Sequence, residues 1–182
     1  DIFSVAHVLG WVAKSLLFRD YTLCFVLSLL WELLEVSFQH LLPNFKECWW
    51  DHYLLDFAGC NLIGMMVGIW CCQKLSALEY NWTGVSRIPS TRGKISRVVR
   101  QFTPFSFTQY SWAALTSFKR LIQVLLLCGA SMTLELNSFF LKHVLWIPPE
   151  CWINTFRLVL MWSLALPAVR EYYEYIGPHT HR

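Results

Sequence analysis

Hydrophobic residues fill four long stretches of this chain and leave few polar positions inside them. The stretches cover residues 21–42, 53–75, 121–147 and 152–169. A helix that crosses a bilayer needs about 20 mainly apolar residues, and each stretch reaches or nearly reaches that length. A shorter apolar segment over 5–18 is expected to contribute part of a fifth helix. The pattern therefore predicts an all-α fold, a polytopic transmembrane helix bundle.

The composition agrees with a membrane protein. Of 182 residues, 55% are hydrophobic, including ten Trp and thirteen Phe, and the mean hydropathy is +0.40, which is more apolar than a typical soluble domain. The seven Cys fall mostly inside the apolar stretches without zinc-ligand spacing, so we expect buried thiols. The chain begins at Asp1 with no initiator Met and no signal-peptide pattern. We expect residues 1–182 to form one transmembrane domain, a fragment of a longer protein.

Basic residues gather in one connection between the apolar stretches. From Lys74 to Arg120 there are eight Lys or Arg and a single acid, Glu79. Because Lys and Arg collect on the cytoplasmic side of membrane proteins, we expect the connection over about 76–118 to be cytosolic. The sequon at Asn81 would then stay unmodified, unless the topology is inverted. The net charge is only +3, and topology and anionic lipid headgroups explain the basic residues, so nucleic-acid binding is not expected.

Prolines and aromatic residues mark where the helices end. Pro148 and Pro149 are expected to stop the third long helix, because proline lacks a backbone donor and restricts the residue before it. Pro167 lies near the end of the last predicted helix, and the polar tail over 170–182 is expected to leave the membrane. Around Pro104, aromatic side chains that favour the headgroup level indicate a short interfacial helix. They are Phe102, Phe105, Phe107, Tyr110 and Trp112.

The most informative polar residues are carboxylates inside apolar helices, where an ionised side chain costs roughly 2.5 to 3.5 kcal/mol. Glu32 and Glu35 stand three residues apart and therefore project from one helical face. Two neighbouring carboxylates repel each other unless one takes a proton or a cation lies between them. A bound cation is the simplest solution.

More oxygen-bearing side chains follow across the turn at 41–44, and they can converge with the first two if the flanking helices pack antiparallel. They are Glu47, Asp51, Asp56 and Asn61. Oxygen-only donors indicate a hard cation, Ca2+ or Mg2+, and the supply of carboxylates favours Ca2+. The alternative is that these acids pair with Lys14, Arg19 or basic residues of absent helices.

Four further polar residues are candidates for the site. His7 lies in an apolar segment, where a neutral imidazole can accept a proton from an alcohol; the alternative is a structural histidine. Glu135 and Asn137, in a later apolar helix, are expected to line a substrate pocket or to form a polar clamp between helices. Arg170 is expected to snorkel to headgroups or to hold a lipid phosphate.

Several motifs carry a family resemblance. The longest is Leu41-Leu42-Pro43-Asn44-Phe45-Lys46-Glu47-Cys48-Trp49-Trp50-Asp51, followed by Asp56 and Asn61. Together with the upstream Trp31-Glu32-Leu33-Leu34-Glu35 and the later Glu135-Leu136-Asn137-Ser138, it resembles the eukaryotic base-exchange phosphatidylserine synthases. The resemblance extends over nearly the whole chain.

The resemblance implies a multi-pass enzyme of the endoplasmic reticulum membrane that exchanges a phospholipid head group for L-serine, without nucleotide activation and usually with Ca2+. The segment at 144–150 looks more like the phosphatidylethanolamine-using and plant-type members than like the choline-exchanging type. The family's essential positions map onto His7, Glu32, Glu35, Asn44, Glu47, Asp51, Asp56 and Asn61.

The favoured hypothesis is that Ca2+ neutralises the lipid phosphate while His7, oriented by Asp56, deprotonates the serine hydroxyl. A phosphatidyl-enzyme intermediate is the alternative course. The expected metal ligands are Glu32, Glu35, Glu47 and Asp51. The expected substrate-binding residues are Asn44, Asn61, Glu135, Asn137 and Arg170.

Rival functions are an intramembrane cation channel or transporter, a lipid scramblase, or a CDP-alcohol phosphotransferase-like enzyme, whose Asp-x-x-Asp-Gly-x-x-Ala-Arg pattern the chain lacks. The partners expected are a phospholipid donor, phosphatidylethanolamine more than phosphatidylcholine, L-serine and the membrane. Whether the protein forms a homo-oligomer stays open.

Overall fold

The computed structural model describes residues 2–46, 48–75, 84–100, 102, 110–148 and 150–177, and these residues contain helices and no strand. The α-helices are α1 (Ile2–Phe18), α2 (Tyr21–Phe38), α3 (Leu62–Leu75), α4 (Thr91–Arg100), α5 (Phe118–Val144) and α6 (Trp152–Ile176). A π-helix, η2 (Asp51–Asn61), leads directly into α3, and short 3-10 turns lie at Pro43–Phe45, Val85–Arg87 and Ala114–Thr116. The expected all-α fold is confirmed.

Four of the described helices are long and apolar enough to cross a membrane: Tyr21–Phe38, Asp51–Leu75, Phe118–Val144 and Trp152–Ile176. They correspond to the four predicted stretches. Helix α1 is the shorter fifth helix and, at 17 residues, is about 25 Å long. Large apolar side chains on the outer faces of these helices are exposed, which suits a bundle that faces lipid. The polytopic bundle is therefore confirmed, while the cytosolic side of the 76–118 connection stays a prediction.

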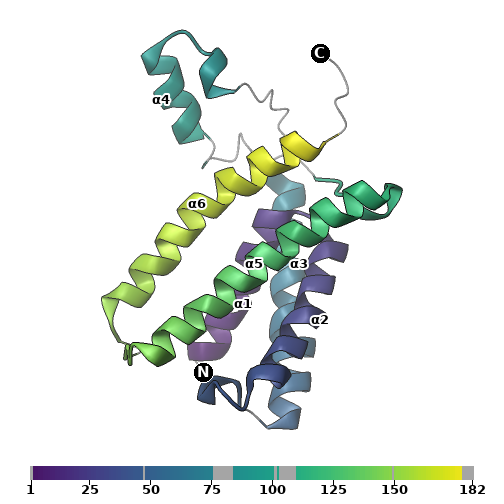
Figure 1. Cartoon of the computed structure of the whole chain (residues 1–182), viewed down its shortest axis with the longest axis vertical. Coiled ribbons are helices and arrows are strands. Elements are labelled where there is room, and N and C mark those ends of the chain that lie inside the picture. The colour runs from purple at the N-terminus through teal and green to yellow at the C-terminus, as the bar shows by residue number, and fades with distance from the viewer. Residues whose placement is uncertain are drawn as a thin grey trace.

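Helices α1, α2 and α3 run side by side, and α5 and α6 cross them obliquely, whereas α4 stands apart from the bundle (Figure 1). The turn between α1 and α2 is tight. Arg19 adopts a left-handed backbone conformation there, with a φ of 53°. The next residue, Asp20, caps α2 by accepting a hydrogen bond from the Leu23 amide at 2.9 Å. This reversal sets α2 antiparallel to α1.

The prolines act as expected at one helix end and not at the other. Helix α5 ends at Val144, four residues before Pro148. Helix α6 passes through Pro167 and continues to Ile176, so the expected end near residue 169 is wrong. A proline removes one backbone donor, but the last turns of α6 bury Val169 and Arg170 against the bundle, and this packing holds the helix together.

The aromatic segment predicted to be interfacial is only partly described, and its depth in a membrane stays a prediction. Tyr110 and Trp112 are buried against the bundle, whereas Phe102 is exposed. The indole Nε1 of Trp112 donates to the Phe18 carbonyl oxygen at 2.8 Å, and both rings pack on Tyr173. Phe105 and Phe107, with most of the expected interfacial helix, lie outside the described residues. The segment thus ties the end of α1 to α6.

Two glycines let α1 and α3 approach closely. A Cβ atom at Gly64 would lie 2.6 Å from the Cβ of Trp11, and one at Gly68 would lie 2.5 Å from the Cβ of Ser15. Small residues spaced four apart are a common means of close helix contact in membranes. The contact matters for the site, because α1 carries His7 and the η2–α3 helix carries Asn61.

Candidate functional site

Asn61 connects three helices at the centre of the bundle. Its side chain is fully buried, at 0% exposure. Its Oδ1 atom lies 2.5 Å from Nε2 of His7 on α1. Its Nδ2 atom donates to Glu32 Oε1 at 2.7 Å and to Ser28 Oγ at 2.9 Å, both on α2. Asn61, His7 and Glu32 are all site residues predicted from the sequence, and Asn61 contacts both of the others.

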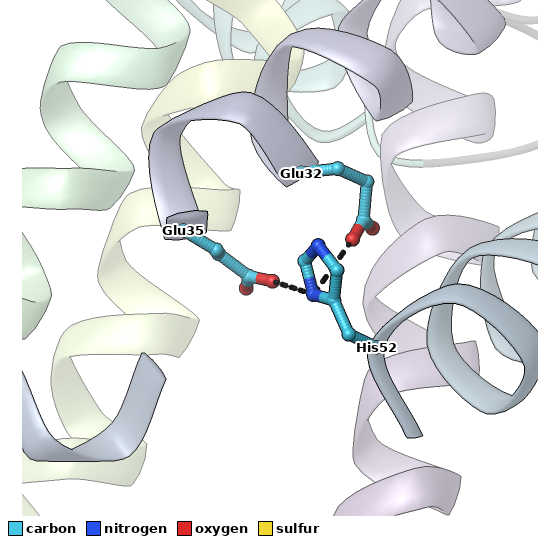
Figure 2. A group of neighbouring side chains, drawn as sticks. All are labelled: Glu32, Glu35 and His52. Atoms are coloured by element: carbon cyan, nitrogen blue, oxygen red, sulfur yellow. Dashed lines mark ion pairs between the residues drawn. The ribbon is translucent and has the colours of Figure 1, made fainter. Parts of the chain in front are cut away.

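A second group of contacts joins His52 to the two glutamates (Figure 2). Nδ1 of His52 lies 3.2 Å from Glu32 Oε2 and 3.6 Å from Glu35 Oε2. Glu35 also accepts a hydrogen bond from the Trp31 indole at 2.7 Å. Glu32 and His52 are 6% and 7% exposed. A single ring nitrogen of His52 thus faces both carboxylates and can donate a hydrogen bond to one of them.

The π-helix explains how His52 and Asn61 reach the same glutamate. They are nine positions apart. In an α-helix with 3.6 residues per turn, that separation is two and a half turns and puts the side chains on opposite faces. In a π-helix, with roughly 4.4 residues per turn, it is close to two whole turns. Both residues therefore contact Glu32 from one face of η2.

The three side chains of this cluster offer donor atoms that all lie within 4.8 Å of one another: Glu32, Glu35 and His52. Two carboxylates suit a divalent cation, because oxygen anions are its usual ligands. Ca2+ takes six to eight oxygen ligands, so it needs oxygens beyond these two groups, and an imidazole nitrogen is not one of them. The expected oxygen-only shell is therefore only partly present among the described residues.

The other expected ligands differ in what the structure says of them. Glu47 and the Asn44 side chain lie outside the described residues. Asp51 and Asp56 lie half-buried on η2, and neither belongs to the 4.8 Å cluster. Asp56 was predicted to orient His7, but among the described residues the hydrogen-bond partner of Nε2 of His7 is Asn61.

Glu135 forms an ion pair with Lys14 of α1. Its carboxylate lies 2.8 Å from the Lys14 ammonium, in a pair that is 16% and 31% exposed. The ammonium also lies 4.1 Å from the ring centre of Trp11 and 5.1 Å from that of Trp31. This is the polar-clamp alternative for Glu135, and it links α5 to α1. Asn137 lies exposed on α5.

Arg170 lies in a different region, where α1, α5 and α6 meet near Tyr110. It is buried, and its Nε atom lies 3.5 Å from Glu174. Arg19 stacks on the Tyr110 ring at 4.5 Å, and burial lowers the pKa of Arg19 and raises that of Tyr110. Arg120 donates to the carbonyl oxygens of Trp112 and Ile176. The lipid-phosphate role expected for Arg170 stays a prediction.

Sequence reasoning missed Ser28 and His52. Ser28 precedes Glu32 by one helical turn, so the i, i+4 spacing alone places both on one face of α2. His52 directly follows Asp51, the last residue of the longest motif, but a histidine does not belong to the oxygen-only ligand set that the sequence predicts. No signal in the hydropathy pattern separates a π-helix from an α-helix at this place.

The fold and site together define a polytopic membrane protein whose spans enclose a histidine, a carboxamide and paired carboxylates. The family model of phosphatidyl serine synthase matches residues 1–182, and the chain belongs to this family. It is 46% identical over 176 residues to CDP-diacylglycerol–serine O-phosphatidyltransferase 3 of Oryza sativa subsp. japonica, covering 97% of this chain and 42% of the relative.

Animal relatives are similar over the same region. Identity to phosphatidylserine synthase 2 of Homo sapiens is 40% over 183 residues, covering 100% of this chain and 38% of the relative. Identity to phosphatidylserine synthase 1 of Danio rerio is 42% over 177 residues, covering 97% and 38%. The chain thus spans about two fifths of the length of the curated relatives it matches. The family predicted from the sequence motifs is confirmed.

Proposed function

We propose that this chain is the membrane-embedded catalytic part of a phosphatidyltransferase that attaches L-serine to the phosphatidyl group of a donor phospholipid by base exchange. The observation that carries the proposal is the contact of His7 with Asn61 and, through it, with Glu32 inside the spans of a phosphatidyl serine synthase family member. A base beside buried carboxylates is what an alcohol needs to attack a phosphodiester.

In the proposed reaction, His7 takes the proton of the serine hydroxyl. The serine oxygen then bonds to phosphorus, and the bond between phosphorus and the oxygen of the old head group breaks. The protonated His7 returns its proton to that departing oxygen. One phosphodiester replaces another, so the exchange needs no nucleotide.

The proposed cofactor is Ca2+, held by Glu32 and Glu35, with Glu47 and Asp51 as the remaining acids of the expected set. When bound, it would supply positive charge against the phosphate oxygens. His52 lies 3.2 Å and 3.6 Å from the two glutamates and can donate a hydrogen bond to one of them when no cation is bound.

The proposed donor is phosphatidylethanolamine rather than phosphatidylcholine, and the proposed location is the endoplasmic reticulum membrane. Both rest on the motifs at 144–150 and 41–51. A homo-oligomer is compatible with the exposed apolar faces of the helices.

A second donor is worth a direct test because of the relatives' names. The plant relatives, up to 46% identical, are called CDP-diacylglycerol–serine O-phosphatidyltransferases. With that donor the leaving group would be CMP instead of an amino alcohol. Serine would still attack the same phosphorus, so His7 and Glu32 would keep their roles.

The deciding experiment measures radiolabelled serine in lipid, using membranes that carry the full-length protein. Phosphatidylethanolamine, phosphatidylcholine and CDP-diacylglycerol are supplied separately, with and without a calcium chelator. We expect incorporation with phosphatidylethanolamine that the chelator abolishes and that His7→Ala reduces by at least a hundredfold, in the range of general-base losses. The matched control, His143→Ala at the exposed end of α5, is expected to keep full activity.

Each alternative has its own outcome in this assay. Incorporation only with CDP-diacylglycerol would show that this lipid is the donor and that the protein does not catalyse base exchange. Unchanged activity in His7→Ala would show that His7 is not the general base. No incorporation with any donor would reject the enzyme, and ion-flux and lipid-scrambling assays would follow.

A further inference from the structure

The hydrogen bonds around Asn61 determine which way its carboxamide points. A carboxamide has one acceptor oxygen and two N–H donors, whereas an ionised carboxylate only accepts. With Glu32 ionised, as the proposed cation site requires, the atom 2.7 Å from Glu32 Oε1 is the nitrogen, as the structure has it. The second N–H points to Ser28 Oγ at 2.9 Å. The oxygen of Asn61 is left facing His7.

This orientation fixes the proton on the His7 ring. The Asn61 oxygen lies 2.5 Å from Nε2 of His7, and it cannot donate. Nε2 must therefore carry the hydrogen. A neutral imidazole has one protonated and one unprotonated nitrogen, so the unprotonated nitrogen is Nδ1.

We propose that Ser28 is a positioning residue for the reaction: together with Glu32 it holds the Asn61 carboxamide in one orientation, so that His7 exchanges protons through Nδ1. Ser28 is fully buried on α2, one helical turn before Glu32. Its hydroxyl oxygen accepts a hydrogen bond from the second N–H of Asn61, which would otherwise be a buried donor without a partner. This inference deepens the proposed function and rests on it for the kinetic test only.

The proton movements then balance at named atoms. The serine O–H gives its proton to Nδ1 of His7 as the serine oxygen bonds to phosphorus. The bond from phosphorus to the departing head-group oxygen breaks, and the proton on Nδ1 moves to that oxygen. Nε2 keeps its hydrogen bond to Asn61 throughout, and Ser28 touches neither substrate.

The first test is spectroscopic and does not need activity. The full-length protein is labelled with 15N-histidine in lipid nanodiscs, and the His7 signals are assigned by their loss in His7→Gln. We expect the pair of nitrogen shifts of an Nε2-protonated neutral ring in the wild type. In Ser28→Ala we expect a smaller share of that tautomer, because Glu32 alone then holds the carboxamide. A His7 ring protonated on Nδ1 in the wild type would overturn the inference.

The second test is kinetic and uses matched serine variants. Ser28→Ala is expected to lower kcat about tenfold, because losing the hydrogen bond that holds Asn61 leaves His7 less well oriented as a base. The KM for serine is expected to stay within about twofold of wild type. Ser28→Thr keeps the hydroxyl and is expected to restore most of kcat. Ser15→Ala is the control, because Ser15 is equally buried but lies on α1 against Gly68.

The outcomes separate this inference from the proposed function. Unchanged kcat in Ser28→Ala, or an equal loss in Ser15→Ala, would contradict a positioning role. If Ser28→Ala does not fold, the activity of Ser28→Thr and the wild-type spectrum still test the positioning role of Ser28. If the wild type incorporates no serine with any donor, the proposed function fails while the tautomer measurement stands by itself.

Discussion

Replacing Gly68 by Ala is expected to push α1 away from α3 and so to disconnect His7 from Asn61. The added Cβ would lie 2.5 Å from the Cβ of Ser15 and 2.8 Å from the carbonyl oxygen of Val12. Ordinary contacts of a Cβ atom begin near 3.4 Å. Both obstacles belong to the backbone or its first side-chain atom, so no rotamer change relieves them.

The size of the effect follows from these distances. Helix α1 must move by about 1 Å at this level, and a shift of that size at His7 would stretch its 2.5 Å contact with Asn61 to the edge of hydrogen bonding. Overpacking of this kind costs typically about 1–3 kcal/mol. Ala gains about 0.5–1 kcal/mol over Gly in a helix, which partly masks the loss.

Gly10→Ala is the matched control that removes this masking. Gly10 lies on α1, and a Cβ added to it would meet no atom within 4 Å, so Ala gains the helix preference without a clash. The free energies of unfolding of Gly68→Ala and Gly10→Ala are therefore expected to differ by about 1–3 kcal/mol. Both are measured for the full-length protein in detergent, by thermal unfolding and by serine incorporation.

Two results would refute the reasoning. If Gly68→Ala unfolds at the same temperature as Gly10→Ala, the close approach of α1 and α3 does not exist as described. If Gly68→Ala is destabilised but keeps wild-type activity, the α1–α3 contact does not control the position of His7.

Three further predictions concern other contacts. Lys14→Met and Glu135→Gln are each expected to destabilise the protein by about 1–2 kcal/mol, and the double variant by less than their sum, in a double-mutant cycle of unfolding free energies. Trp112→Phe, which removes the indole donor to Phe18, is expected to cost about 1 kcal/mol in the same assay. Because burial raises the pKa of Tyr110 above its ordinary value of 10.0, the folded protein holds that proton more tightly than the unfolded chain, and stability is expected to fall as the pH rises past that value. Tyr110→Phe should reduce the fall in melting temperature between about pH 9 and pH 11.

The spans could be predicted from the sequence because the bilayer sets a length that apolar runs must match. The long helices begin and end within a few residues of the expected stretches, except α6, which continues past Pro167 to Ile176. What the hydropathy pattern could not supply was the position of Tyr110 and Trp112, because an aromatic ring suits both the lipid edge and a buried contact with Tyr173.

The candidate site was predictable where burial makes a residue costly. Glu32 and Glu35 stand out in an apolar helix for that reason, and the structure places them beside one histidine. Ser28 is small and uncharged, so its burial costs little and leaves no trace in the pattern. For Glu135 the sequence leaves a substrate pocket and a polar clamp open, because its partner Lys14 lies on a helix whose approach to α5 only the tertiary fold decides.

The π-helix is the reason why both His52 and Asn61 can contact Glu32, a juxtaposition that the sequence pattern does not predict. An α-helical interpretation of 51–61 puts His52 and Asn61 on opposite faces, so only one of them could meet Glu32. With the wider turn, Glu32 uses Oε1 for Asn61 and Oε2 for His52, at 2.7 Å and 3.2 Å. One carboxylate therefore joins the two halves of the site, with the proposed base on one side and the second glutamate on the other. A change that restores α-helical geometry to η2 would separate these halves without altering any of their side chains, because their connection depends on the backbone.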